Sequence, residues 1–373
     1  MLRVTLTADS LLADLQTAAR IASSRSAVQA LSGVLVSAAG DYLELQATDM
    51  EVSLRVRLSA SVEEPGEVVL PARLLLDIVR SLPGASVTLA ERSDHHDVEI
   101  ASGNAVFAVR TLRRDDFPRL PEPPTGGVQL AAQAFVDTIA RVARSASRDD
   151  TRPVLTGIMV HASGGELRMV ATDSYRLSVK TTALDEAVSD SFEANVPARA
   201  LQELSRIVAQ SEADHVTIGR LENQVVFAVH GAGGPATISS RLIDGQFPSY
   251  QQLLPESVEH ELRVDREELV SVTRRISLLA QKNAPLRLAF AEGQLQVSAQ
   301  TPDIGEAHET LPVPFHGEAF EIGFNPEFFR DGLESVDSPE VLLRLTSPLR
   351  PGLIESADES GFVYLVMPIR LGT

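Results

Sequence analysis

Apolar and polar residues alternate through the segment 165–177, with Leu167, Met169 and Ala171 on one side of the extended backbone. This period of two is typical of a β-strand with one buried face. The polar run around Asp173 that follows carries short side chains, which bond to nearby backbone in turns. A second strand is expected to leave this turn. The segment therefore predicts two paired strands joined by a tight turn.

The same pattern occurs three times along the chain. The segment 40–54 carries it 124 residues earlier, with Asp49 in the place of the later aspartate, and the segment 293–302 carries it more weakly. The second half of the pattern recurs as well, because Pro71-Ala72-Arg73 returns as Pro197-Ala198-Arg199. A period of this length is an ordinary domain size and is too long for a solenoid. The repeat predicts three related domains, which span residues 1–124, 125–254 and 255–373.

Apolar residues spaced three or four apart predict two helices in each domain. In the first helix, for example, the apolar stripe is Leu11, Leu15 and Ala18. Pro71 and Pro197 are expected at the first position of later helices, which proline favours. Strands separate the helices, so each domain should be two strand–helix–strands units, an α+β fold with helices on one face of antiparallel sheets. The predicted helices cover residues 8–25, 71–82, 132–148, 197–210, 265–282 and 325–336.

Composition narrows the chemistry and the compartment. The chain contains no cysteine, which excludes disulfides, thiolate nucleophiles and metals bound by cysteine. Its first residues already predict a strand and the start of a helix, so a signal peptide is not expected. No apolar run approaches the roughly 20 residues that span a bilayer. We therefore expect a cytoplasmic protein.

The charge is unevenly distributed. The formal net charge of −18 by itself argues against nucleic acid, since phosphates repel a uniformly acidic surface. The predicted helices nevertheless carry a net charge of +3, and in one of them Arg141, Arg144 and Arg148 share a face. Helix 325–336 is the exception, with a net charge of −2. Two interpretations stay open, namely ordinary solvated helix faces or a helical surface that faces a polyanion.

Motifs of common enzymes are missing from the sequence. It has no GxxxxGK[ST] loop for nucleotide phosphates, and the glycine cluster 231–234 precedes a predicted strand instead of a helix. The neighbours His95 and His96 point apart in a charged turn, so a metal site is not expected there. Asp49 and Asp173 lie a whole domain apart and cannot share one ion. We expect them to cap turns, in a protein that is not an enzyme and needs no cofactor or metal.

Five short motifs are spread along the chain: LTG at Leu155–Gly157, VATDSYRL at Val170–Leu177, FPSY at Phe247–Tyr250, GFN at Gly323–Asn325 and the terminal VMPIRL. Together they resemble the bacterial DNA polymerase III β subunit family, the sliding clamps. The resemblance covers the whole chain, including the threefold repeat, the length and the acidic balance. Each motif alone is weakly specific, but their combination is highly specific.

This resemblance implies a DNA-clamp fold, in which two subunits pair head to tail into a ring of six domains. Sheets form the outside, and twelve helices line a hole for duplex DNA, in agreement with the charge distribution. A closed ring would hold DNA by topology, so phosphate contacts can stay weak and independent of sequence, which permits sliding. Pairing across subunits would also remove open sheet edges, and two-fold closure would prevent runaway assembly.

The resemblance implies three sets of site residues. A hydrophobic groove for partner peptides would be lined by Leu155, Thr172, Ser174, Tyr175, Arg176, Leu177, Pro248, Leu253, Met367, Pro368, Ile369 and Arg370. Backbone phosphates of DNA would meet Arg25, Arg73, Arg80, Arg152 and Arg199, and subunits would meet through Phe107, Leu278 and Leu279. A plain core position is the alternative for Leu155, Leu177 and Met367. A solvated surface role is the alternative for each arginine.

The implied partners are duplex DNA, a second copy of the chain, the polymerase III α subunit and a clamp loader. Other DNA polymerases, ligase and mismatch-repair proteins would bind through short linear motifs, and no membrane is involved. Ser174 stands where many relatives carry glycine, and Gly372-Thr373 extends past the usual terminal leucine, so both can alter the groove. A divergent second clamp, acting in repair or in resistance to a groove-binding inhibitor, is one alternative. A hydrolase that uses the repeated carboxylates is another, and it predicts loss of turnover on Asp173→Asn.

Overall fold

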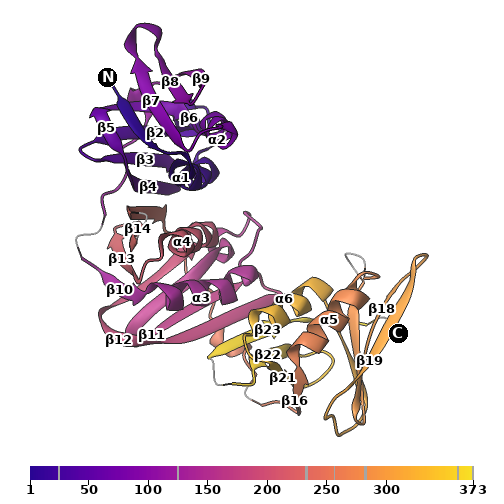
Figure 1. Ribbon diagram of the computed structural model, residues 1–373. Helices are drawn as coiled ribbons and strands as arrows, with labels where there is room; N and C mark the ends of the chain where they lie inside the picture. Colours follow the sequence, from indigo (N-terminus) through magenta and orange to yellow (C-terminus); the bar gives the residue numbers. More distant parts are fainter. Residues whose placement is uncertain are drawn as a thin grey trace. The chain divides into compact units, whose positions relative to one another are not determined.

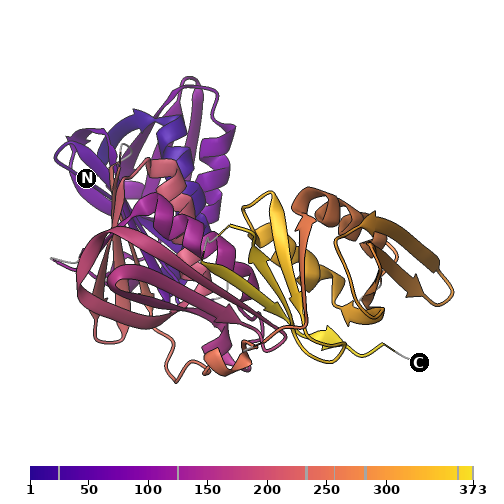
Figure 2. The same cartoon turned by 90° about the horizontal axis from the view of Figure 1, so that it is seen from below.

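The computed structural model of the chain describes residues 1–23, 26–123, 126–231, 234–255, 257–280, 284–358 and 361–371. These residues form two compact units. One unit consists of residues 1–136, 188–190 and 199–242, and the other of residues 137–187, 191–198 and 243–373. In each unit helices cover one face of antiparallel sheets (Figure 1, Figure 2), which is the α+β arrangement that the sequence predicts.

The described residues contain six α-helices, which lie where the apolar stripes predict them, although some end early. The third helix stops at Val142 and is followed by a single 3-10 turn, so Arg148 does not share its face as predicted. Beyond that turn Ser147 accepts a hydrogen bond from the amide of Asp149, a local bond that competes with helix. The helices are α1 (Ala8–Ile21), α2 (Ala72–Ser81), α3 (Ala132–Val142), α4 (Ala198–Ser211), α5 (Arg266–Ser277) and α6 (Pro326–Ser335).

Prolines lie at the start of three of these helices, in two different positions. Pro71 and Pro197 are the last residues of strands, and α2 and α4 begin one residue later than predicted. Pro326, by contrast, is the first residue of α6. There the side chain of Asn325 accepts hydrogen bonds from two backbone amides of the first turn, which satisfies donors that a helix start leaves unpaired.

The first unit contains two sheets. One has the strand order β5-β1-β7-β8-β9, and the other has the order β10-β13-β14-β15-β4-β3-β2-β6. The strands are β1 (Arg3–Thr7), β2 (Gly33–Ala39), β3 (Tyr42–Thr48), β4 (Val52–Ser59), β5 (Ser61–Glu64), β6 (Gly66–Pro71), β7 (Ser86–Arg92), β8 (Asp97–Ser102), β9 (Ala105–Arg110), β10 (Val128–Ala131), β13 (His215–Leu221), β14 (Gln224–Gly231) and β15 (Gly234–Arg241).

The second unit also contains two sheets. Their strand orders are β11-β12-β23-β22-β21-β16 and β19-β18-β17-β20-β24. The strands are β11 (Gly157–Thr172), β12 (Arg176–Pro197), β16 (His260–Asp265), β17 (Leu286–Ala291), β18 (Gln294–Thr301), β19 (Gly305–Pro312), β20 (Phe320–Phe324), β21 (Glu340–Leu345), β22 (Gly352–Ser356), β23 (Phe362–Val366) and β24 (Pro368–Ile369).

The repeated aspartates cap turns, as the sequence predicts. Asp49 accepts hydrogen bonds from the amides of Glu51 and Val52 at 3.0 and 2.8 Å, in the turn between β3 and β4. Asp173 accepts the same pair of bonds between β11 and β12, from amides two and three residues ahead, at 2.9 and 3.0 Å. The residue after each aspartate has a positive φ, 77° at Met50 and 80° at Ser174. The two turns therefore have the same geometry.

Paired helices form the cores against the sheets. In the first unit α1 and α2 lie side by side (Figure 1), and Leu11, Leu15 and Leu75 are fully buried. In the second unit α5 and α6 pack together and bury Leu269 and Leu333. These contacts fix which helix faces remain exposed to carry function.

The chain that leaves the first repeat is held on the sheet surface and is not a free linker up to residue 122. Phe117 and Leu120 are buried in a small apolar cluster. The guanidinium of Arg55, on β4, binds the carboxylate of Glu122 at 2.9 Å. This anchoring holds the chain against the first repeat as far as Glu122.

Candidate peptide groove, basic surface and free strand edges

Tyr175 is the most exposed large apolar residue among those predicted to bind partner peptides. It follows the capped turn at Asp173, is 60% exposed and stacks on the ring of Phe328, with the two centroids 6.5 Å apart. Its carbonyl oxygen accepts a hydrogen bond from the amide of Met367 at 2.9 Å. The second unit thus brings together the motif around Tyr175, the start of α6 and the end of β23.

Arg176 lies beneath this aromatic pair. Only 8% of its side chain is exposed, and its guanidinium lies 4.3 Å from the centroid of the Phe328 ring. It donates to Asp173 at 3.0 Å and to Asp331 at 2.5 Å. Burial alone would lower the pKa of Arg176, but Tyr364, Asp331 and Asp173 raise it above the ordinary value. Its charge is therefore compensated within the protein, and Arg176 forms a fixed base of the site.

The predicted groove residues apart from Arg176 are buried, exposed or, in the case of Pro368 and Ile369, partly buried. Leu155, Thr172 and Leu177 are buried, and Leu177 belongs to an apolar cluster with Tyr250 and Leu365. This favours the core interpretation for Leu155 and Leu177. Those that reach the surface are Ser174, Tyr175, Pro248, Leu253, Met367 and Arg370.

Met367 is 40% exposed and so is not a core residue. The residues after it are positioned by a short strand pair, in which Pro368 lies opposite Phe324 and Ile369 opposite Gly323. A Cβ atom on Gly323 would approach the Ile369 carbonyl oxygen within 2.9 Å, so the close approach of these strands requires glycine. The terminal extension Gly372-Thr373 lies outside the described residues.

Two of the arginines predicted to contact DNA line a shallow depression of about 680 Å³ in the first unit. Arg73 and Arg80 project from α2, and Arg20 projects from α1, next to Glu203 of α4. Arg20 is hydrogen bonded to Glu203, and Arg80 lies 3.5 Å from Asp77. The depression therefore presents basic groups on the exposed side of a helix pair.

The remaining predicted DNA contacts are held differently. Arg199 binds Asp49 at 2.5 Å, and Arg152 donates to Asp149 at 3.1 Å and to Ser174 at 3.0 Å. Arg25 lies outside the described residues. Contact with a phosphate would thus compete with existing ion pairs at Arg199 and Arg152, which the sequence did not indicate.

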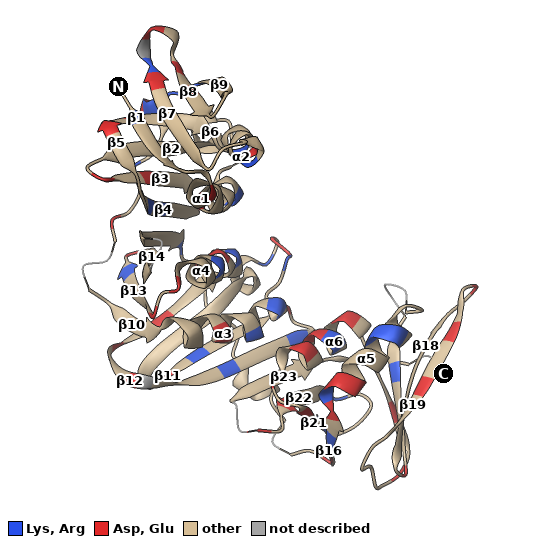
Figure 3. Cartoon of the chain, in the orientation of Figure 1, with Lys and Arg blue, Asp and Glu red and all other residues tan. Residues whose placement is uncertain are grey.

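The acidic helix α6 is neutralised by its neighbours. Glu334 binds Arg144 and Arg274, each at 2.7 Å, and Asp331 binds Arg144 and Arg176. Although burial alone would raise it, hydrogen bonds from these arginines lower the pKa of Glu334. Figure 3 shows the acidic and basic segments of α5 and α6 close together. The net charge of −2 on α6 therefore does not describe the charge around this helix, because arginines of other segments pair with its acidic side chains.

Two of the three residues predicted to join subunits lie at solvent-exposed positions. Leu278, after the end of α5, is 84% exposed, and Phe107 on β9 is 36% exposed. Leu279 is partly buried, and its carbonyl oxygen accepts a hydrogen bond from Thr301 at 2.5 Å. Within the described ranges, β9 and β19 each pair with a single strand and leave one edge open.

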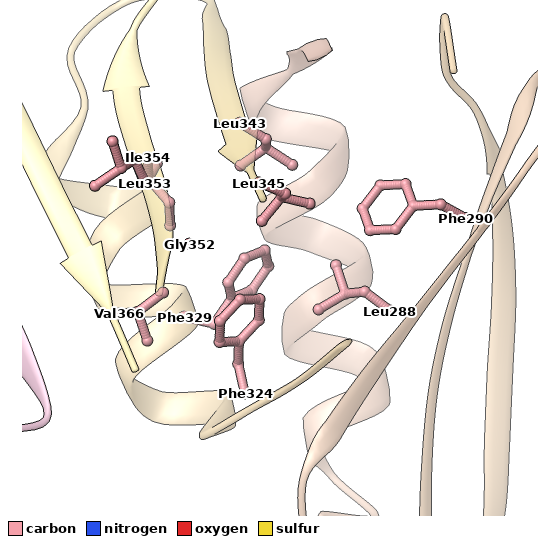
Figure 4. Close-up of a pocket in the computed structure, with 10 residues that line it drawn as sticks. All are labelled: Leu288, Phe290, Phe324, Phe329, Leu343, Leu345, Gly352, Leu353, Ile354 and Val366. Atoms are coloured by element: carbon pink, nitrogen blue, oxygen red, sulfur yellow. The ribbon is translucent and has the colours of Figure 1, made fainter. Parts of the chain in front are cut away.

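An apolar cavity inside the second unit is too small to be a ligand site. It measures about 10 Å³, at the lower limit for one water molecule. Phe324 and Phe329 stack at its wall with centroids 5.4 Å apart (Figure 4). In the part of the chain that the structure describes, no group of three His, Asp or Glu side chains is placed to hold a metal ion. No described helix is long and apolar enough to cross a membrane.

Sequence reasoning missed the roles of Phe328, Arg20 and Arg144. Phe328 looks like a core residue in the apolar stripe of α6, but its ring also stacks with Tyr175 and contacts the guanidinium of Arg176. Arg20 and Arg144 lie 124 residues apart, which is the repeat distance. The recurrence of the arginine could therefore have indicated that the two residues have the same role. Their acidic partners are far away in sequence and gave no such signal.

Comparison with known proteins agrees with the repeat. Three family models match successive parts of the chain: the N-terminal domain of the DNA polymerase III β subunit at residues 2–121, its central domain at 129–249 and its C-terminal domain at 251–370. The β sliding clamp of Streptomyces coelicolor is 33% identical over 365 residues, which cover 95% of each chain.

Solved structures agree as well. The DNA polymerase sliding clamp of Bacillus subtilis is 28% identical, with a TM-score of 0.90 and full coverage of both chains. The sliding clamp of Pseudomonas aeruginosa, solved bound to griselimycin, is 30% identical with a TM-score of 0.88, over 99% of this chain and 100% of that one. The chain belongs to the DNA polymerase III β subunit family, the bacterial β sliding clamps, which are processivity factors and not enzymes.

Proposed function

We propose that this protein is a three-domain clamp, with boundaries at 1–124, 125–254 and 255–373, that closes head to tail with a second copy around duplex DNA. Its groove would then tether the replicative polymerase and other DNA-processing proteins. Membership of the β sliding clamp family supports the general role.

The main support for the ring is the way in which sheets continue from one repeat into the next. β4 of the first repeat pairs with β15 of the second, and β12 of the second pairs with β23 of the third. In each case the strand that follows the aspartate-capped turn pairs with the last strand of the following repeat. In the described part of the chain the corresponding strands, β19 and β9, each pair on one side and leave the other edge open. A second copy supplies both, because its β9 can pair with β19 and its β19 with β9.

Strand register makes this pairing specific. Ile238 lies opposite Leu54, and Tyr364 lies opposite Ser178. Phe107 occupies the place of Ile238 and Tyr364 in the last hairpin of its own repeat. Ala307 takes the place of Leu54 and Ser178, so we expect Phe107 opposite Ala307 of the partner subunit. Ile238 and Tyr364 are buried, whereas Phe107 is 36% exposed in the single chain. This difference is expected if the partner subunit buries Phe107 in the dimer.

The peptide groove would use exposed apolar side chains on a rigid base. Tyr175, Leu253 and Met367 are all at least 40% exposed, and the pairing of Arg176 with Asp331 holds the floor beneath Tyr175. Aromatic, leucine and methionine side chains suit short linear peptides from many proteins. The α subunit of polymerase III, the clamp loader, other polymerases, ligase and mismatch-repair proteins are the proposed ligands.

Contact with DNA would remain weak, as sliding requires. Arg73 and Arg80 line an exposed depression, while Arg152 and Arg199 are partly neutralised by Asp149 and Asp49. A closed ring needs no strong phosphate contacts to stay on DNA, so this compensation agrees with a mobile complex.

Retention on DNA of different topology tests the ring directly. The protein would be loaded by its clamp loader on a nicked circle, and the circle would then be linearised. We expect persistence on the intact circle and rapid loss from the linear product. Equal retention on both would mean ordinary electrostatic binding and would contradict the clamp.

Peptide binding tests the groove. Tyr175→Ala should weaken the binding of a fluorescent polymerase-tail peptide roughly tenfold, because aromatic anchors contribute most of the affinity in such sites. Leu349→Ala is the matched control, since Leu349 is 63% exposed but is not one of the proposed groove residues. Equal affinities in all three proteins would contradict the groove.

The alternative of a divergent second clamp, acting in repair or in inhibitor resistance, stays a prediction. Replacement of the organism's normal clamp by this chain separates the two hypotheses. Growth at the normal rate favours the replicative clamp, and failure to grow favours a specialised copy.

A further inference from the structure

We infer that Ile304 of one subunit packs against Leu74 of the partner subunit. The inference rests on the proposed head-to-tail ring and specifies part of its subunit contact. It is derived from the contact between Tyr175 and Phe328 inside the chain. The internal repeat places Ile304 and Leu74 at the corresponding positions of the interface between subunits.

The first equivalence concerns the turns. Ser174 and Asp303 both have a positive φ, 80° and 64°, and each lies at the turn before the outer strand of its hairpin. Tyr175 follows the first of these residues and Ile304 follows the second. The third-repeat turn is one residue longer, with Ala299 opposite Ala307 where Ala47 lies opposite Leu54, but counting back along the second strand agrees. Ile304 lies three residues before Ala307, and Tyr175 lies three residues before Ser178, which takes the same place. Ile304 is therefore the third-repeat counterpart of Tyr175.

The second equivalence concerns the helices. Phe328 is the third residue of α6, and Leu74 is the third residue of α2. Both helices are the second of their repeat, and each begins directly after a residue that ends or follows a strand. Leu74 is therefore the first-repeat counterpart of Phe328.

Within the second unit these positions touch, since Tyr175 stacks on Phe328. At the subunit interface the same geometry would bring Ile304 onto Leu74. Both side chains are apolar, yet Ile304 is 54% exposed and Leu74 is 49% exposed. Burial against one another would remove both surfaces from water, which is favourable.

The third relationship is at the end of the first helix of each repeat. Arg20, Arg144 and Leu278 each lie twelve residues after the first residue of their helix. Arg20 and Arg144 bind acids on the sixth residue of the next repeat's second helix, Glu203 and Asp331. In the third repeat leucine replaces the arginine. The sixth residue of α2 is Asp77, which is exposed and lies 3.5 Å from Arg80 of the same helix. The subunit contact would therefore lack the arginine–acid pair that joins neighbouring repeats within the chain.

A double-mutant cycle on dimer dissociation tests the pair. Leu74→Lys and Ile304→Glu would each weaken the dimer about tenfold or more, because each places a lone charge in an apolar contact. The double variant should recover roughly tenfold of that loss, since opposite charges would then face each other. Dissociation constants would be measured by sedimentation or subunit exchange. Both positions are exposed in the single chain, so folding of the subunit should be unaffected.

Leu221→Glu is the matched control, at a position 46% exposed and on neither proposed edge, and it should leave the dimer unchanged. Loss in the double variant equal to the product of the two single losses would overturn the pairing of Ile304 with Leu74. A wild-type chain that is monomeric at every concentration would instead overturn the proposed ring, so the two failures are distinguishable.

Discussion

The Nε atom of Arg20 donates a hydrogen bond to the carboxylate of Glu203 across 2.9 Å, and these residues lie 183 positions apart in the chain. The duplication reproduces the relationship in the second unit, where Arg144 lies 3.3 Å from Asp331. Each pair joins the end of one repeat's first helix to the second helix of the next repeat. The duplication has thus preserved a contact between neighbouring repeats as well as the repeats themselves.

Arg20→Met should lower the free energy of unfolding by about 1–2 kcal/mol, since Glu203 is buried and loses a hydrogen bond from a charged group while keeping Arg206. Urea unfolding measures the change. Arg3→Met is the control, because Arg3 and Glu63 form an exposed ion pair and its loss should cost less than about 0.5 kcal/mol. Equal effects of the two variants would show that burial of Glu203 has no energetic consequence.

Ser174→Gly should raise the free energy of unfolding by up to about 1 kcal/mol, because glycine adopts a φ of 80° without the steric cost of a side chain. Met50→Gly, in the matching turn of the first repeat, should behave likewise. Thermal unfolding of both variants checks this. Ser37→Gly on β2 is the control and should destabilise, and a loss of stability in the two turn variants would contradict the argument.

Burial raises the pKa of the Asp14 carboxyl to about 6 from its ordinary value of 3.8. The folded protein therefore holds this proton more tightly than the unfolded chain. The contribution of Asp14 to stability is greatest near pH 4 and is lost as the pH rises through 6. Asp14→Asn should raise the free energy of unfolding at pH 7 by roughly 1–2 kcal/mol after allowance for solvent screening.

The Asp14 prediction is checked by urea unfolding of both proteins between pH 4 and pH 7.5. The stability difference between Asp14→Asn and the wild type should be small at pH 4 and should grow toward pH 7. A difference that is constant with pH would assign the effect to packing, and not to the ionisation of Asp14.

Gly332→Ala should lower the melting temperature, although alanine is the better helix former. A Cβ atom at Gly332 would lie 2.6 Å from the ring of buried Tyr364, so α6 would have to move away from β23. The expected cost is about 1–3 kcal/mol. Gly165→Ala is the control, because nothing lies within 4 Å of the added atom there. Unchanged stability in Gly332→Ala would mean that the helix shifts freely.

The sequence alone determined the repeat, the helices and the turns. Their signals are local: an alternation around Leu167, an apolar stripe through Leu11 and Leu15, and an aspartate that caps a turn from within its own segment. Such features depend on residues a few positions apart, so periodicity reveals them. Motifs such as those near Tyr175 then identified the family.

Only the tertiary structure decided which charges remain available and which side chains meet. The sequence indicates no partner for Arg176 or Arg199. In the structure each binds a carboxylate from a distant segment, Asp331 and Asp49 respectively. Phe328 became part of the candidate groove because α6 packs beside the turn at Tyr175. These outcomes depend on pairings between residues more than 100 positions apart, which no local pattern encodes.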